Sequence, residues 1–129
     1  MIKIKAFTYL IGQFLILTTS YAQEIVHYDK NKVSKETELN IAFTGKRGIE
    51  SKKGIIYYVE EDKKTLTAYS RGEIKWKTNI IATCGEPEVG KPEIRYFKLE
   101  KGIIKVIFGK HNFAEIDIRD GKTECAGSD

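Results

Sequence analysis

Apolar and polar residues alternate along Glu73–Ile81, which reads EIKWKTNII. One face of the stretch takes four residues: Ile74, Trp76, Thr78 and Ile80. The residues between them are charged or carry an amide. A period of two residues is typical of a β-strand with one buried face. We therefore predict a strand over 73–81 that buries its Ile74–Ile80 face.

The segments around this stretch repeat the same pattern of short strands and polar turns. Further strands are expected over 55–60, 65–71, 93–100, 103–108, 113–119 and 122–126. The Asp120-Gly121 pair is a strong hairpin signal. Ile103–Phe108 is apolar on both faces except for Lys105, which favours a central strand. No persuasive helical period appears. The sequence predicts an all-β fold: a small antiparallel sandwich, a partial barrel or a two-blade-like meander.

Residues 1–22 have the composition of a secretory signal peptide. Two lysines precede an apolar run at 6–17, and Ser20 and Ala22 are the small residues of a cleavage site. The run is shorter than the roughly 20 apolar residues of a membrane span, and no later stretch is longer. We expect cleavage before Gln23 and export without a transmembrane segment. The Ala-Gln junction resembles signal peptides of bacteria with two membranes, which favours the periplasm over the medium.

The charge balance limits the class of partner. The 129 residues carry 22 Lys and Arg and 18 Asp and Glu. Without the two lysines of residues 1–22, the remaining 107 residues have 20 cations and 18 acids, a net charge of +2. This balance does not favour a nucleic-acid binder. We expect an extended polar arm at 23–38 and one β-domain at 39–129, with hairpin units at 54–81 and 93–127.

Cys84 and Cys125 are the only cysteines, and both follow the predicted signal peptide. In an exported protein an even cysteine count indicates a disulfide. The bridge closes a loop of 42 residues (84 through 125), worth roughly 4 kcal/mol in the chain-entropy description. One alternative is a Cys84 nucleophile with His111 as its base. A metal site is not expected, because the cysteines and histidines lack ligand spacing.

Two units of the sequence resemble each other. Gly54-Ile55-Ile56 and Gly102-Ile103-Ile104 begin these units, 48 residues apart. Further matches pair Leu66 with Phe113, Tyr69 with Ile116, Gly72 with Gly121, and Trp76 with Cys125.

Residues 54–79, and less clearly 102–127, resemble the repeat of pyrroloquinoline-quinone-type β-propellers. That family places a leucine, an alanine, a glycine turn and a tryptophan along the inner strands of a blade. A closed propeller requires at least four blades of some 40 residues, more than this chain supplies. The family's cofactor-binding residues have no counterpart here, so no cofactor is expected.

The longest irregular stretch, Ala82–Pro92, contains both prolines and Cys84. It is longer than a hairpin connection requires. A loop that is stiffened by prolines and tied by a disulfide loses little entropy on docking, which favours binding. The candidate binding residues are Gly85, Glu86, Pro87, Glu88, Val89, Gly90, Lys91 and Pro92. The alternative is a plain crossover between two sheets.

No motif of a catalytic site is present. The paired carboxylates fall in predicted turns, where nothing desolvates them as an acid catalyst requires. The basic pairs Lys46-Arg47, Lys52-Lys53 and Lys63-Lys64 are expected to be solvated turns. Of each adjacent aromatic pair, Tyr57-Tyr58 and Tyr96-Phe97, one side chain is expected to point inward and the other outward.

The main hypothesis is a small exported binding protein rather than an enzyme. Its partner would be a protein or cell-envelope component, as for an inhibitor or immunity-type protein. One alternative is a structural component that assembles with itself. The other is a small-ligand carrier or enzyme with its site between the sheets, which requires a pocket of roughly 300 Å³ or more.

Overall fold

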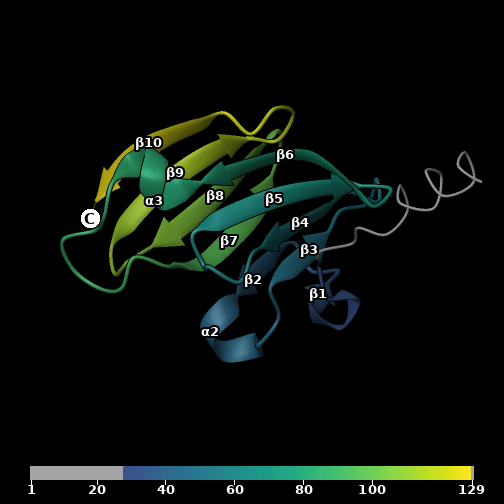
Figure 1. Ribbon diagram of the computed structural model, residues 1–129, viewed down its shortest axis with the longest axis horizontal. Helices are drawn as coiled ribbons and strands as arrows, with labels where there is room; N and C mark the ends of the chain where they lie inside the picture. Colours follow the sequence, from purple (N-terminus) through teal and green to yellow (C-terminus); the bar gives the residue numbers. More distant parts are fainter. Residues whose placement is uncertain (1–27, 129) are drawn as a thin grey trace, which may run out of the picture.

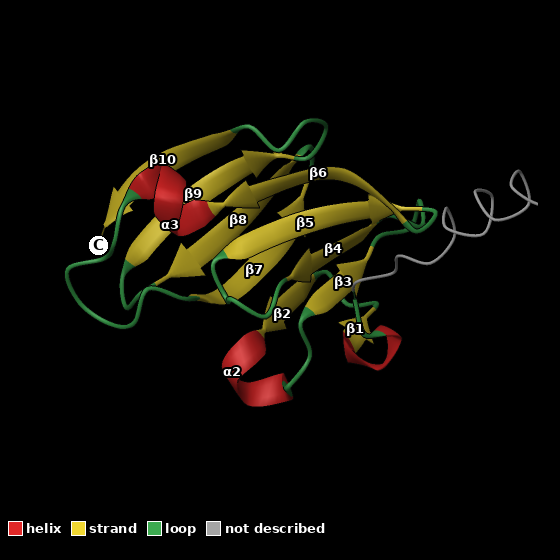
Figure 2. Ribbon diagram, viewed as in Figure 1, coloured by secondary structure: helices red, strands yellow, loops and turns green. Residues whose placement is uncertain are grey.

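The computed structural model describes residues 28–128, which form a sandwich of two five-stranded β-sheets (Figures 1 and 2). The first sheet has the order β1 (Val33–Ser34), β3 (Gly48–Glu50), β4 (Ile56–Val59), β5 (Thr65–Ser70) and β6 (Glu73–Asn79). The second has the order β10 (Thr123–Ser128), β9 (Asn112–Asp117), β8 (Ile103–Phe108), β7 (Ile94–Glu100) and β2 (Glu38–Asn40). Neighbouring strands are antiparallel except β1 and β3. The predicted all-β class is confirmed. The predicted signal peptide, 1–22, lies outside the described residues.

Each sheet is built around four strands that follow one another in the chain. These are β3 to β6 in the first sheet and β7 to β10 in the second. Two one-turn helices carry the chain between the sheets: α2 (Ile41–Thr44) connects β2 to β3, and α3 (Ile80–Cys84) connects β6 to β7. A 3-10 turn, η2 (Lys30–Lys32), precedes β1.

The two one-turn helices use the same capping residues. The side-chain oxygens of Asn40 and Asn79 each accept a hydrogen bond from the backbone N–H three residues later. The hydroxyls of Thr44 and Thr83 donate to the carbonyl of the same asparagine, at 2.8 and 2.9 Å. Ile80 is buried as predicted, but as the first residue of α3 rather than in a strand. Helices this short do not show a helical period, so the sequence pattern did not predict them.

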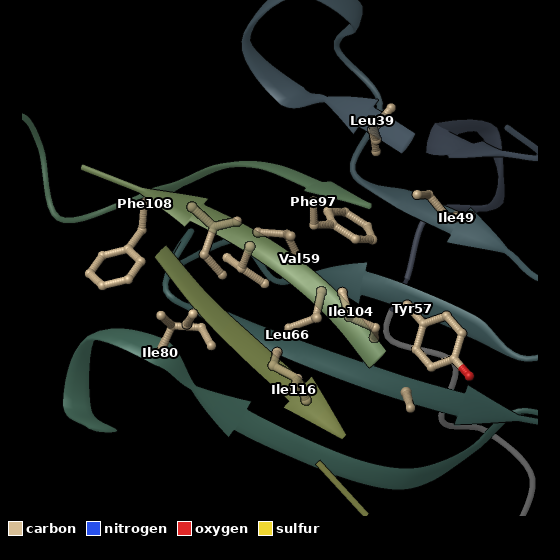
Figure 3. Close-up of a cluster of buried hydrophobic side chains, with 14 of the residues drawn as sticks. Leu39, Ile49, Tyr57, Val59, Leu66, Ile80, Phe97, Ile104, Phe108 and Ile116 are labelled. Atoms are coloured by element: carbon tan, nitrogen blue, oxygen red, sulfur yellow. The ribbon is translucent and has the colours of Figure 1, made fainter. Parts of the chain in front are cut away.

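The core fills the space between the two sheets (Figure 3). It is formed by the inward residues of the strands together with two isoleucines of α3. Its fully buried members include Ile49, Val59, Leu66, Ala68, Ile80, Phe97, Ile104 and Ile116. Strand β8 lies between β7 and β9, as its apolar sequence predicted.

The predicted burial along β6 is correct for Trp76 and wrong for Ile74. Ala68 pairs with Trp76, whereas Tyr69 pairs with Ile74, so Lys75 is an extra residue without a partner on β5. Such a β-bulge shifts the alternation by one residue. Ile74 therefore lies 47% exposed, while Trp76 exposes only 7% of its surface.

The outer face of the first sheet is covered by residues that come from the predicted arm. The ring of Tyr28 lies 5.9 Å from that of Tyr58 and 4.8 Å from that of Tyr69, measured between centroids. Tyr58 is therefore buried although it points outward, while its neighbour Tyr57 belongs to the core. Strand β1 also joins the arm to the sheet, beside β3.

The two similar units, 54–79 and 102–127, supply strands β4 to β6 and β8 to β10. The sequence comparison pairs Leu66 with Phe113, but these two residues differ in burial. Leu66 belongs to the core, whereas Phe113 is half-buried and its neighbour Ala114 belongs to the core instead. The units thus correspond as strands. The resemblance to a propeller repeat stays a prediction.

Candidate functional site

A disulfide between Cys84 and Cys125 joins the end of α3 to the edge strand β10, as predicted. Their Cα atoms lie 5.6 Å apart. The same edge of the sandwich is closed by Trp76, whose indole N–H donates to the carbonyl of Ile118 at 3.0 Å. Trp76 lies in β6 of the first sheet, and Cys84 follows that strand in α3. Ile118 directly follows β9 and Cys125 lies in β10, both strands of the second sheet, so these two contacts link the sheets. A disulfide is consistent with export.

The predicted binding residues Gly85–Pro92, which we call the stapled loop, begin directly after the disulfide and project at the left of Figure 1. The loop rests against the turn between β8 and β9. The Lys110 N–H donates to the Val89 carbonyl at 2.9 Å. A Cβ placed on Gly90 would lie 2.6 Å from the Lys110 nitrogen, so only glycine permits this approach. The stapled loop is therefore fixed both at its base and at its far end.

Most side chains of the stapled loop face solvent. Val89 is 52% exposed, and Glu86, Glu88 and Lys91 are exposed as well. Neither glutamate forms an ion pair within residues 28–128. His111 lies beside the stapled loop. Together with Glu86 and Glu88 it lines a hollow of about 360 Å³. The result is a rigid, acidic projection with an apolar residue near its tip.

A second hollow, of about 790 Å³, lies at the opposite end of the sandwich. We call it the end hollow. Three connections and one strand line it: the β3–β4 turn, the β7–β8 hairpin, the β9–β10 connection and the bulge within β6. The lining residues include Lys52, Lys53, Lys75, Lys101 and Arg119. The sequence interpretation missed this site because it read Lys52-Lys53 as a solvated turn.

The remaining perturbed groups have structural explanations. Partial burial and a 2.8 Å hydrogen bond to Glu38 raise the pKa of Tyr96 to about 12, and this bond ties β7 to β2. Burial and a 2.7 Å hydrogen bond to Glu60 also raise the pKa of Tyr69. Hydrogen bonds from Arg119 lower the pKa of the exposed Asp117 to about 2. These pairs fix turns and strands.

Cys84 is oxidised, so the alternative of a Cys84 nucleophile is excluded in this state. Within residues 28–128, no group of three His, Cys, Asp or Glu side chains is placed to hold a metal ion.

Within the same range, none of the helices has the length and hydrophobicity required to cross a membrane.

No family model matches the sequence, and no curated protein matches it. The geometry of the stapled loop and the end hollow is therefore the basis for a functional proposal.

Proposed function

We propose that this chain is an exported binding protein that recognises a protein or cell-envelope component through the stapled loop. The observation that carries the proposal is that Gly85–Pro92 is tied at its base by the disulfide and held at Val89 by the β8–β9 turn, while the side chains of Glu86, Glu88 and Val89 face solvent. A surface that is already ordered loses little conformational entropy on binding.

The exposed chemistry of the stapled loop indicates what its partner offers. Glu86 and Glu88 form no ion pair within the described chain. The exposed Val89 follows Glu88 directly in the sequence. Complementary charge favours specific association, so the partner would present cations around a small apolar pocket. An inhibitor or immunity-type role against a secreted or envelope enzyme fits such a projecting loop. We expect the periplasm as the compartment.

Capture of the partner tests this proposal. The bait is oxidised protein of residues 23–129, which contains the whole sandwich, and the sources are envelope and secreted fractions of the host. The loop variant carries Glu86→Gln, Glu88→Gln and Val89→Ser. The matched control carries Glu61→Gln, Glu73→Gln and Ile74→Ser, an equal change on another exposed surface. One stoichiometric partner that is retained by the control and lost by the loop variant supports the proposal. Equal recovery by both variants contradicts it.

A further inference from the structure

The end hollow is independent of the proposed function, because the two sites lie at opposite ends of the second sheet. Strand β8 begins at Ile103, beside the end hollow, and ends at Phe108, beside the turn that supports the stapled loop. Six residues of strand span about 20 Å. A ligand of one site therefore does not occupy the other.

The floor of the end hollow is apolar. Ile55, Leu99 and Ile118 line it, and each packs against the edge of the core between the sheets. At about 790 Å³, the hollow has the size of a small-molecule site. This volume exceeds the roughly 300 Å³ that a site for a small ligand requires. The floor thus offers a place for an apolar group.

The rim of the end hollow concentrates positive charge. Lys52 and Lys53 are the two central residues of the turn that Ser51 and Gly54 close. Lys75 is the extra residue of the β6 bulge, and Lys101 lies in the β7–β8 hairpin. All four lysines are exposed, and none forms an ion pair within the part of the chain that the structure describes.

The other charged residues of the rim are already paired. Arg119 binds Asp117 at 2.8 Å, and Glu100 faces Lys98 and Lys105 at 3.8 and 3.5 Å. Four unpaired cations therefore remain in a chain whose mature net charge is only +2. A hollow lined by one sign of charge attracts ions of the opposite sign. The rim thus favours an anionic group.

Tyr57 is the second, independent indication of a ligand. It exposes 2% of its surface and lines the end hollow. In Figure 3 its hydroxyl points away from the other labelled side chains. None of the hydrogen bonds among the described residues engages this hydroxyl, and it is not one of their fully buried polar atoms, so it is open to the hollow that Tyr57 lines. A tyrosine phenol is protonated at neutral pH and can donate a hydrogen bond, and burial raises the pKa of Tyr57 further.

We infer that the end hollow binds a small amphiphile, which places a carboxylate or phosphate group between the four lysines and the Tyr57 hydroxyl and its apolar part on the Ile55–Leu99–Ile118 floor. Lysine side chains supply mobile cations that neutralise such a headgroup. The buried phenol adds one directed hydrogen bond. Apolar burial supplies most of the affinity.

Calorimetric titration of the oxidised mature protein tests this inference with four probes, each below its micelle-forming concentration. Decanoate and decyl phosphate combine an apolar chain with the two kinds of headgroup. Decanol has the chain alone, and inorganic phosphate has the headgroup alone. We expect saturable 1:1 binding of at least one charged amphiphile, at least tenfold tighter than either partial probe and weakened by salt. The tighter of the two amphiphiles identifies the headgroup.

Three variants locate the binding site. The triple change Lys52→Gln, Lys75→Gln and Lys101→Gln is expected to weaken binding about tenfold. Tyr57→Phe keeps the ring and removes the hydroxyl, with an expected loss of about fivefold. The matched control, with Lys30, Lys35 and Lys110 changed to Gln, carries the same charge change away from the hollow and is expected to bind normally.

Several results would overturn the inference. One is the absence of binding by both charged amphiphiles. Another is equal binding of decanol, which would remove the role of the lysines. Equal losses in the triple variant and its control would place any binding elsewhere. Urea unfolding of each variant shows whether it still folds. A variant that does not fold is replaced by the single change Lys75→Gln, which is expected to weaken amphiphile binding about threefold.

Discussion

Replacement of both Cys84 and Cys125 by alanine removes the disulfide that ties the end of α3 to the second sheet. Cys84 ends α3, which follows the first sheet, and Cys125 lies in the edge strand of the second. The double change avoids a free thiol and leaves the hydrogen bond from Trp76 to Ile118 in place. Its main effect is therefore expected on the unfolded chain, which is no longer cross-linked.

The size of this effect follows from the length of the closed loop. The two cysteines are 41 residues apart in sequence. For a loop of this length the chain-entropy relation gives about 4 kcal/mol at 25 °C. A domain of this size has a total stability of roughly 5–15 kcal/mol. The variant is therefore expected to fold with a much smaller margin.

Urea unfolding followed by circular dichroism measures this loss. With a slope of about 1.3 kcal/mol/M, the midpoint is expected to fall by about 3 M urea. Wild-type protein that has been reduced and alkylated serves as a second reference without the bridge. Hydrogen exchange at the Lys110 amide, which bonds to Val89, is also expected to accelerate, because the stapled loop loses its anchor.

A loss below about 1 kcal/mol would refute this reasoning, since the bridge would then not restrict the unfolded chain as the loop length requires. Unchanged exchange at Lys110 would show that the turn holds the stapled loop without the disulfide. The loop would then owe its rigidity to Gly90 and its neighbours.

Three further predictions concern the sandwich itself. Gly121→Ala is expected to destabilise it by about 2 kcal/mol in urea unfolding, because Gly121 has a φ of 79° and a Cβ there would lie 2.7 Å from the Trp76 ring; an unchanged midpoint would argue against this contact. Asn79→Ala is expected to lower the stability by about 1 kcal/mol through loss of the α3 cap, whereas Asn79→Asp retains most of it; equal losses would show that capping is not the cause. The Tyr96 pKa of about 12 exceeds the ordinary value of 10, so its share of stability is complete below pH 10 and is lost as the pH rises to about 12. Urea midpoints across this range are expected to fall less steeply in Tyr96→Phe than in wild type, and identical slopes would contradict the role of the Glu38 bond.

The sequence predicted the fold class because strand alternation is a local property. Ile103–Phe108 and its neighbours indicate strands without knowledge of their partners. The bulge at Lys75 depends on how β6 pairs with β5, so the exposure of Ile74 could not be predicted from β6 alone. The helix α3 did have a usable signal: a capping asparagine, Asn79, followed by Gly85 just after the last helical residue.

The two sites differed in how far the sequence could indicate them. Cys84 and Pro87 lie within one short irregular segment, so the stapled loop was visible as a unit. The end hollow draws Lys52 and Lys101 from two turns and Lys75 from the bulge of β6, three places far apart in the sequence. Each lysine alone has the pattern of a solvated surface residue. Only the packing of the two sheets places them around one opening beside the buried Tyr57 ring.

Titration of the captured partner shows whether the stapled loop is the binding surface. Wild type, the Glu86→Gln/Glu88→Gln/Val89→Ser variant and the matched control are titrated against that partner by calorimetry. Contacts at the centre of an interface contribute more than about 1 kcal/mol each, so the loop variant is expected to bind at least tenfold more weakly while the control binds as wild type. Equal affinities for all three proteins would contradict recognition through the stapled loop.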